Sequence, residues 1–437
     1  MMNYAQTLQY LQEVQERGSK LSLDNIQKII DHLPFDLSSM RFIQVAGTNG
    51  KGSTAHFLTS ILQSAGSKVG LFTSPHLQDI RERITINKAW ISKKNFAACL
   101  FQVKQISEDL LQKGLIENMP TFFEYIFLTA VTYFFRNKAG YVVLEVGLGG
   151  RLDATSTLTP AVSVITNISY DHTKTLGKRI SDIAVEKAGI IKKRVPIICG
   201  CSVYSAANRV IREIAQKRNA PFYNVLNAKN KLDTQKYNGF YRCVYVTESG
   251  RYEFDVHLNG RHQTANAATA IRAVEVLNKT TTGANITPTA IREGIAKSFV
   301  PGRIEIFKSS PQVILDGGHN VESIKALRNY LEQERKKNLT LVFGVLRDKK
   351  YRKMASLLLP FAKNVIITEP VSKRALPAEN LVKFFIKENN HSNFNLNIEI
   401  KKKPGDAFHA ASRFREDILI TGSLYLAGEM RNIIKGG

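Results

Sequence analysis

The segment VAGTNGKGST, residues 45–54, decides how the first part of the chain folds. It contains the glycines, the lysine and the hydroxyl side chains of a phosphate-binding loop. The common P-loop, however, has a glycine five positions before its Gly-Lys pair and a serine or threonine directly after the lysine. Here Val45 occupies the first of these places, and Gly52 separates Lys51 from Ser53. The segment is therefore either a nucleotide site of a different kind or a glycine-rich turn that contains a lysine.

The flanking residues favour the nucleotide site. An apolar strand is predicted at residues 41–46, and apolar residues at helical spacing predict a helix that ends at Gly66. Backbone N–H groups at such a turn attract anions, and glycines allow close approach. We expect Lys51 to reach the outer phosphates of a nucleotide and Ser53 or Thr54 to supply a hydroxyl. The loop residues are Gly47, Thr48, Asn49, Gly50, Lys51, Gly52, Ser53 and Thr54.

Outward from the loop, short apolar runs rich in β-branched residues alternate with helices. This alternation is typical of a parallel sheet that is buried on both faces. Further strands are predicted at residues 69–72, 141–146, 161–168 and 195–199, and a helix at 122–135. Residues 222–260 are different, because two alternating runs flank Glu248-Ser249-Gly250 and indicate a β-hairpin.

The chain of 437 residues is long for one domain. Val300-Pro301-Gly302-Arg303 interrupts the pattern, and a second series of strands and helices follows it. We predict an α/β protein. A nucleotide-binding domain at residues 1–300 has a mostly parallel sheet with the phosphate loop and the β-rich segment near 222–260. A smaller Rossmann-like α/β domain occupies residues 301–437.

Composition limits the class of protein. The hydrophobic fraction of 43% is that of an ordinary folded protein. No apolar run has the length of a membrane span, and the chain does not begin with a leader-like segment. We therefore expect a soluble, cytoplasmic protein without a membrane partner. The four cysteines form no CxxC pair and are expected to be reduced and buried.

The net charge of +24 suggests an anionic partner. Nucleic acid and an anionic small molecule are the two candidates, and a well-solvated surface is the third explanation. The basic residues are spread along the chain, without an RNA-binding signature or zinc-finger spacing. We therefore expect no nucleic-acid partner.

Polar residues follow the predicted strands at the edge where open α/β sheets bind ligands. Glu145 ends the strand at 141–146, and a carboxylate that faces a phosphate loop suits Mg²⁺. His172 ends the next strand region, where a structural and a functional role are equally compatible with the sequence. Lys187, on a predicted short helix, is by itself more typical of a surface lysine. Asp316 and His319 lie where the second domain would face the first.

Together these motifs resemble the folylpolyglutamate synthase and dihydrofolate synthase family, which belongs with the Mur-type ATP-dependent amide ligases. The resemblance runs from about residue 20 to the C-terminus, with the motifs in the family's order. The motifs are VAGTNGKGST (45–54), TSPHL (73–77), RERI (81–84), LEVGLGGRLDAT (144–155), DHTKTLG (171–177), EKAGI (186–190), VPGR (300–303), DGGHN (316–320) and GSLYL (422–426). It implies that the first domain is like the Mur ligase central domain and the second is a glutamate-ligase domain.

The resemblance also implies roles for individual residues. The loop would bind the phosphates of ATP, and Asn266, Arg303 and Asp316 would contact ATP as well. The implied Mg²⁺ ligands are Ser74, Glu145, His172 and Lys187, the last as a carbamate. Phe123 and Asp153 would lie near the pterin, and His319 and Ser423 near the incoming glutamate. The implied catalytic residues are Lys51, His172, Lys187 and His319.

The reaction that the resemblance implies joins L-glutamate to the carboxylate of dihydropteroate, of a reduced folate, or of both. It uses ATP, passes through an acyl phosphate and releases ADP and phosphate. We expect a monomer. Another Mur-type amino-acid ligase, of the peptidoglycan type, is the nearest alternative, although TSPHL and GSLYL disfavour it. A nucleic-acid-binding ATPase is suggested only by the charge, and a non-catalytic nucleotide-binding protein would not need the retained polar residues.

Two departures from the family's pattern affect the second domain. Gly318 and Val321 stand where the family usually has the Ala and Pro of D-x-A-H-N-P. Lys350 stands where it often has Asp. Because Asp316, His319 and Asn320 are retained, we expect the chemistry to be retained too.

Overall fold

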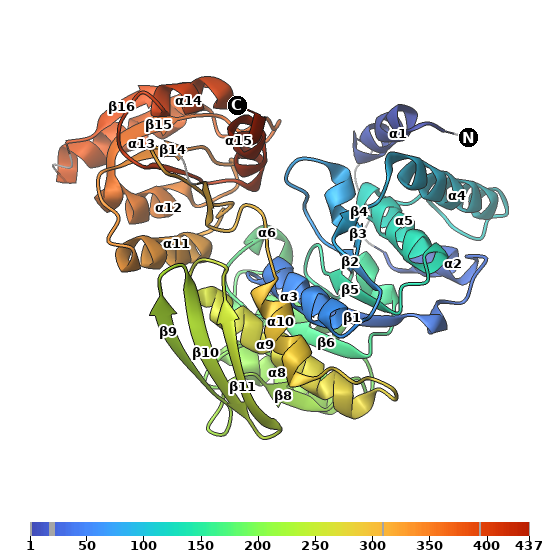
Figure 1. The fold of residues 1–437 in the computed structure, drawn as a ribbon. Helices are drawn as coiled ribbons and strands as arrows, with labels where there is room; N and C mark the ends of the chain where they lie inside the picture. Colours follow the sequence, from blue (N-terminus) through green and yellow to red (C-terminus); the bar gives the residue numbers. More distant parts are fainter. Residues whose placement is uncertain (1, 17–21, 308–309, 393–394, 437) are drawn as a thin grey trace.

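The computed structural model describes residues 2–16, 22–307, 310–392 and 395–436, so the start of the resemblance near residue 20 lies outside the described residues. The described residues form three sheets of eight, three and six strands. The six-stranded sheet and its helices, orange and red in Figure 1, form a lobe apart from the rest of the molecule. None of the helices described is long and apolar enough to cross a membrane.

The eight-stranded sheet carries the phosphate loop, with strand order β4-β3-β2-β5-β1-β6-β7-β8. The neighbouring strands β2, β5, β1, β6, β7 and β8 pair in parallel. Beside β2, the strands β3 and β4 form an antiparallel edge. The predicted mostly parallel sheet is confirmed. The strands are β1 Arg41–Ala46, β2 Val69–Phe72, β3 Ile84–Ile86, β4 Ala89–Trp90, β5 Tyr141–Glu145, β6 Val162–Ile165, β7 Ile197–Cys199 and β8 Phe222–Asn224.

Helices cover both faces of this sheet, which explains the nearly continuous apolar sequences of its central strands. Side chains alternate between the faces: Phe42 joins one core, and Ile43 and Val45 join the other. On the face of Ile43 lie α3 Lys51–Ser64, α9 His262–Thr280 and α10 Pro288–Ala296. On the other face lie α1 Tyr4–Glu16, α2 Asp24–Asp31, α4 Lys93–Gln112, α5 Phe122–Arg136, α7 Ile180–Lys187 and α8 Ala206–Lys217.

The β-rich segment is divided between two sheets. The predicted hairpin is present, as β10 Phe240–Thr247 and β11 Gly250–Val256. With β9 Lys231–Tyr237 they form an antiparallel sheet that packs through Tyr245 and Phe254 on the core beneath α9. The first part of the predicted segment is different, because β8 extends the main sheet.

The second domain has a six-stranded sheet between two layers of helices, with strand order β12-β13-β17-β14-β15-β16. Its strands are β12 Glu305–Phe307, β13 Val313–Leu315, β14 Leu339–Phe343, β15 Ala362–Ile367, β16 Asn397–Ile400 and β17 Ile418–Thr421, and only β12 is antiparallel. One face packs against α11 Val321–Gln333, α12 Tyr351–Leu358 and α13 Ala378–Ser392, the other against α14 Pro404–Ala411 and α15 Leu424–Gly436. The arrangement confirms the predicted Rossmann-like α/β layering.

The crossing of α10 over α3 depends on Gly294. A Cβ atom at this position would lie 2.4 Å from the Ile61 Cα and 2.6 Å from the Ile61 nitrogen. We expect Gly294→Ala to lower the free energy of unfolding by about 1–3 kcal/mol, because overpacking displaces the backbone. Chemical denaturation followed by circular dichroism measures this change.

Gly405, in α14, provides the matched control, since an added Cβ there meets no described atom within 4 Å. Gly405→Ala should not lower the free energy of unfolding, and the helix propensity of alanine should raise it by up to about 1 kcal/mol. If both variants lose the same stability, close packing at Gly294 is not the cause.

Candidate active site

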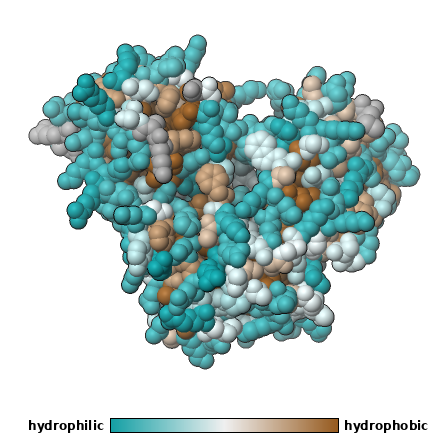
Figure 2. Space-filling view, in the orientation of Figure 1, coloured by the Kyte–Doolittle hydropathy of each residue, from teal (hydrophilic) through white to brown (hydrophobic). Residues whose placement is uncertain are grey.

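A cleft of about 700 Å³ lies between the two domains, at the carboxyl ends of the parallel strands. The register aligns these ends, because Val45 of β1 pairs with Glu145 of β5, and Ala46 with Ile165 of β6. On the face that Figure 2 shows, the surface is hollowed between the two lobes. The predicted site residues that line the cleft are Thr48, Asn49, Gly50, Lys51, Gly52, Ser53, Ser74, Phe123, Glu145, His172, Lys187, Asn266, Arg303, Asp316, His319 and Ser423. Gly47, Thr54 and Asp153 lie outside the lining.

Two positions of the loop require glycine because neighbouring side chains leave no room for a Cβ atom. Gly47 has φ +146°, and a Cβ there would lie 1.9 Å from Thr166 Oγ1. Gly50 has φ +80°, and its Cβ would lie 2.4 Å from Asn266 Oδ1. A side chain at either position would therefore displace the loop. At these two positions the atoms that leave no room for a Cβ belong to the side chains of Thr166 and Asn266.

The two hydroxyl residues after Lys51 point in different directions. Ser53 lines the cleft, whereas Thr54 is fully buried. Within the described residues the Thr54 hydroxyl has no hydrogen-bond partner. Ser53 is therefore the residue of the two whose side chain faces the cleft. Lys51 begins α3, and its ammonium donates to the Thr48 carbonyl at 3.3 Å.

Glu145 is a buried carboxylate against the loop. Its Oε2 accepts a hydrogen bond from the Ser74 backbone N–H at 3.1 Å. A Cβ on Gly52 would lie 3.5 Å from the same oxygen, so the carboxylate lies close to the start of α3. Burial raises the pKa of Glu145, and the nearby Lys51 charge opposes this shift. A buried carboxylate with one hydrogen bond from the protein favours a cation beside it.

Lys187 is buried, so the interpretation as a surface lysine is wrong. It is the last residue of α7 and only 5% exposed. Its ammonium donates to the Gly47 carbonyl at 2.8 Å, which joins α7 to the first residue of the loop. Burial, and secondarily the charge of Lys51, lower the pKa of Lys187 to about 7.

Asp153 does not reach the cleft. Its Oδ2 accepts from the backbone N–H groups of Gly147 and Leu148, both at 2.9 Å. Its Oδ1 accepts from the backbone and the hydroxyl of Thr155. Both oxygens are therefore used in shaping the loop after β5. Phe123 contacts the same loop, since a Cβ on Gly147 would lie 2.7 Å from its ring.

The second domain contributes polar residues from the loops after β13 and β17, of which Asp316 and Ser423 are buried and His319 is partly exposed. Asp316 accepts from the N–H groups of Ile304 at 3.0 Å and Gly318 at 2.8 Å. Burial raises the pKa of Asp316, and the charge of Arg303 opposes the shift. Burial also lowers the pKa of His319 to about 4, which favours a neutral imidazole at pH 7. Ser423 accepts from the Tyr425 N–H at 3.1 Å.

The departures at positions 318 and 321 fit this geometry. A Cβ on Gly318 would lie 2.6 Å from Asp316 Oδ1, so the glycine leaves room for this carboxylate. Val321 is the first residue of α11, a position where proline is also favourable. Asn320 caps the helix by accepting from the Ser323 N–H at 2.9 Å.

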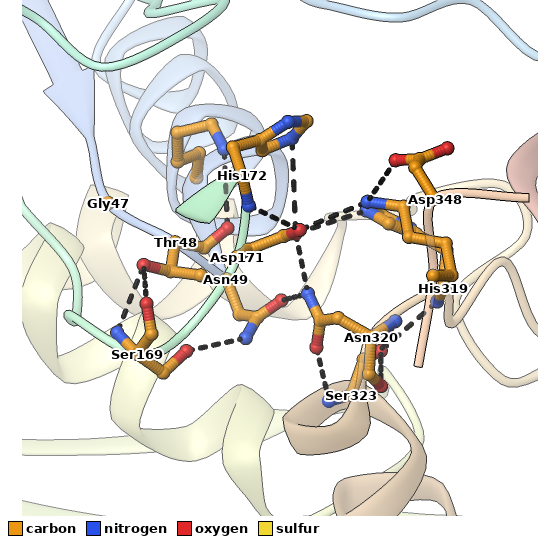
Figure 3. Close-up of polar contacts among 12 residues, drawn as sticks. Gly47, Thr48, Asn49, Ser169, Asp171, His172, His319, Asn320, Ser323 and Asp348 are labelled. Atoms are coloured by element: carbon orange, nitrogen blue, oxygen red, sulfur yellow. Dashed lines mark hydrogen bonds and ion pairs between the residues drawn. The ribbon is translucent and has the colours of Figure 1, made fainter. Parts of the chain in front are cut away.

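Contacts across the cleft were missed by the sequence analysis. Asp171 forms an ion pair with Lys349 at 3.0 Å. It also accepts a hydrogen bond from Asn320 Nδ2 at 3.1 Å (Figure 3). Asn320 Nδ2 also donates to Asn49 Oδ1 at 2.9 Å. Asp171 is the first residue of the motif DHTKTLG (171–177), next to His172, and this position was the available signal that it belongs to the site. Nothing local to residue 349 indicates its partner.

Comparisons with known proteins find relatives that match most of the chain. Residues 45–274 match the family model for the Mur ligase middle domain, and residues 303–433 that for the dihydrofolate synthetase C-terminal domain. The chain is 35% identical to dihydrofolate synthase/folylpolyglutamate synthase of Bacillus subtilis, covering 96% of both chains. It is 33% identical to folylpolyglutamate synthase of Lacticaseibacillus casei, covering 100% of both.

Solved structures of relatives also match the chain over nearly its whole length. Mycobacterium tuberculosis folylpolyglutamate synthase complexed with ADP is 28% identical, with a TM-score of 0.89 and 99% of both chains covered. Escherichia coli FolC in complex with DHPP and ADP is 27% identical, with a TM-score of 0.85, covering 100% of this chain and 98% of that one. The predicted fold class is confirmed, and the chain belongs to the dihydrofolate synthase/folylpolyglutamate synthase family of Mur-type ligases.

Proposed function

We propose that the cleft joins the amino group of L-glutamate to a carboxylate of a pterin or folate, with ATP as the energy source. Membership of the family makes the chain an ATP-dependent ligase that acts on small molecules. The observation that carries the proposal is the convergence of Lys51 and Glu145 from one domain with Asp316 and His319 from the other on one cleft. Since one chain supplies both sides, we also propose that it acts as a monomer.

ATP is proposed to bind with its phosphates on the loop. The backbone N–H groups at the start of α3 and the Lys51 ammonium would neutralise them. Asn266 lines the same wall, next to Gly50. Arg303 and Asp316 would complete the nucleotide site from across the cleft. The solved relatives that contain ADP support this assignment.

A Mg²⁺ ion fits the residues beside the loop. Glu145 offers a buried carboxylate, and Ser53 and Ser74 offer hydroxyl oxygens, which are the hard ligands that Mg²⁺ prefers. Among the residues described there is no cluster of three or more His, Cys, Asp or Glu that could hold a metal. This suits Mg²⁺, which often takes one or two carboxylates and completes its shell with phosphates and water. When bound, the ion would offset the negative charge of the phosphates. His172 and Lys187, the latter as a carbamate, would lie nearby.

The proposed reaction has two steps. A carboxylate acylates poorly because oxide is a bad leaving group. An oxygen of the substrate carboxylate therefore attacks the γ-phosphorus of ATP, the bond to ADP breaks, and an acyl phosphate forms. The glutamate amine then attacks the acyl carbon, loses a proton, and displaces phosphate as the amide forms. Lys51 and the loop amides stabilise charge in the first step, and the two domains exclude water that would hydrolyse the acyl phosphate.

The substrate residues are proposed from their places in the cleft. Phe123 lies beside the loop after β5, where its ring offers a flat apolar surface to a pterin. His319 and Ser423 lie on the second domain, where the incoming glutamate would enter. Asp153 would act by shaping the loop at Gly147 and Leu148, because its oxygens are already bonded there.

The test of the function is phosphate release with ATP and L-glutamate against a panel of acceptors, with products identified by mass. Dihydropteroate and a reduced folate are the two informative acceptors. Glutamate-dependent release with a product heavier by one glutamyl residue is expected with at least one of them. ATP hydrolysis that responds to nucleic acid and needs no glutamate would contradict the proposal, as would glutamylation of a nucleotide-sugar substrate alone.

The net charge of +24 leads to a prediction about salt. A substrate whose glutamate tail grows becomes more anionic, and exposed charges attract it over a Debye length of about 10 Å at 0.1 M salt but about 3 Å at 1 M. We expect the Michaelis constant for a long-tailed folate to rise several-fold over this range. The monoglutamate is the control and should change less. Parallel salt curves for both substrates would contradict a role of the charge in binding the tail.

A further inference from the structure

Asp171 lies where the two domains touch, between β6 and the short helix α6 Thr173–Leu176. It belongs to the first domain, yet most of its partners belong to the second. Figure 3 shows its carboxylate between His172 on one side and His319 and Asn320 on the other. The side chain is only 11% exposed, so these contacts are largely shielded from water.

Both carboxylate oxygens are occupied. Oδ1 accepts from the Lys349 ammonium at 3.0 Å and from the backbone N–H of His172 at 2.9 Å. Oδ2 accepts from Asn320 Nδ2 at 3.1 Å and lies 3.8 Å from His319 Nε2 and 4.0 Å from His172 Nε2. Asp171 therefore contacts three residues of the second domain and holds the residue that follows it.

The hydrogen bond between Asp171 and the His172 N–H lies at a residue with an unusual backbone conformation. His172 has φ +49° and ψ +36°, a left-handed conformation that a non-glycine residue adopts at a cost. The Asp171 carboxylate holds the His172 N–H in this conformation. The imidazole of His172 lines the cleft and is 43% exposed, so its own packing does not fix it.

The same network reaches the phosphate loop. The Asn320 amide group donates to Asp171 and to Asn49 Oδ1. The backbone N–H of Asn49 in turn donates to Asn167 Oδ1 at 2.9 Å. The second domain thus bonds to the loop at Asn49 and to Asp171, the residue that holds the His172 N–H. Opening the cleft would break these bonds together.

We propose that Asp171 is a positioning residue that couples closure of the second domain, through Lys349 and Asn320, to the placement of His172 and the phosphate loop. The inference rests on the proposed function for the reaction that it assists. Lys349 suits the role because its side chain is only 7% exposed, so a cation there needs a partner when the cleft is closed. Asp171 itself does no chemistry, since its oxygens are already bonded.

The test uses Asp171→Asn, Lys349→Met and the double variant. The asparagine keeps the shape and one acceptor oxygen but loses the charge and the acceptor for Asn320. We expect kcat to fall by roughly 10- to 50-fold in each single variant, with the Michaelis constant for ATP changed less than about threefold. The double variant should fall little further than the singles, because both remove the same interaction.

Small-angle scattering gives a readout independent of turnover. With an unhydrolysable ATP analogue and acceptor present, the wild type should contract, and the two single variants should stay closer to the nucleotide-free size. Lys336→Met is the matched control, since Lys336 pairs with Asp417 at 2.7 Å inside the second domain, away from the cleft. It should behave like the wild type in both measurements.

Any one of the following results would overturn the inference. They are turnover within threefold of the wild type in Asp171→Asn, losses that multiply in the double variant, and a contraction identical to that of the wild type. A fall in melting temperature with unchanged turnover of the folded fraction would also overturn it, because the role would then be structural. If the wild type itself ligates no glutamate, the proposed function fails instead, so the two failures are distinguishable.

Discussion

Lys51→Ala is expected to lower kcat by on the order of 10²-fold or more, because it removes a charge that stabilises the phosphoryl-transfer step. Lys51 begins α3, lines the cleft and lies near the buried Glu145. Its ammonium now donates to the Thr48 carbonyl, a contact of modest strength that phosphate oxygens would replace. The alanine keeps the helix, because alanine has the highest helix propensity.

A single-turnover experiment locates the defect. ADP formation measured by rapid quench should slow as much as the steady-state rate, and adding more glutamate should not restore it. Lys113→Ala is the control, since Lys113 is 61% exposed and pairs with Asp109 on a helix surface. Turnover of Lys51→Ala near that of the wild type would remove the loop from the mechanism.

The sequence predicts the central sheet well because local and long-range signals agree there. Residues 41–46 and 69–72 are found as β1 and β2 with the predicted bounds. In a sheet buried on both faces, hydrophobicity, β-branching and the flanking glycines all indicate strand. The helix α4, by contrast, was not predicted although its signals exist. Ser92 caps it, and Phe96, Leu100 and Val103 recur on its buried face.

The site was predicted less completely, for a physical reason. The expectation for Lys187 from local pattern was solvent exposure, because no pattern within α7 indicates that the Gly47 loop covers its last residue. Likewise the sequence leaves Ser53 and Thr54 equivalent, and only the helix direction sends one into the cleft and the other into the core.

Contacts between the domains are the hardest to predict. Asp171 and Lys349 are 178 residues apart. Their pairing depends on how two complete sheets face each other, and no periodicity or motif spacing reports that arrangement. The resemblance to a family identified the residues at each strand end. It did not show which of them bond to one another across the cleft.

The environment of Lys187 makes carbamylation chemically reasonable. A carbamate forms when a neutral amine attacks CO₂, and an ordinary lysine with a pKa near 10.4 is neutral in only about one molecule in 10³ at pH 7. Burial lowers the pKa of Lys187 to about 7, so that about half is neutral. The group would turn a buried cation in the wall of the cleft into an anion. It would also relieve the repulsion between Lys187 and Lys51 that contributes to the low pKa.

Lys187→Ala is therefore expected to lose roughly three orders of magnitude in kcat, since a charge next to a metal and phosphates contributes several kcal/mol to the transition state. Small carboxylates such as acetate should restore part of the activity, because they can occupy the space and supply the missing negative charge. Lys192→Ala is the control: Lys192 is also partly buried and donates to the Ser156 carbonyl, but it does not line the cleft. That variant should not respond to acetate.

Mass spectrometry of the wild type separates the carbamate from an unmodified lysine. Trapping the group by alkylation at neutral pH should give a peptide containing Lys187 that is heavier by the trapped CO₂ and the added alkyl group, and removing bicarbonate before trapping should reduce its yield. Activity should follow the yield in the same samples. An unmodified Lys187 together with full activity in CO₂-free buffer would contradict the carbamate. The side chain would then act as the ammonium group that donates to the Gly47 carbonyl, and acetate should fail to rescue the alanine variant.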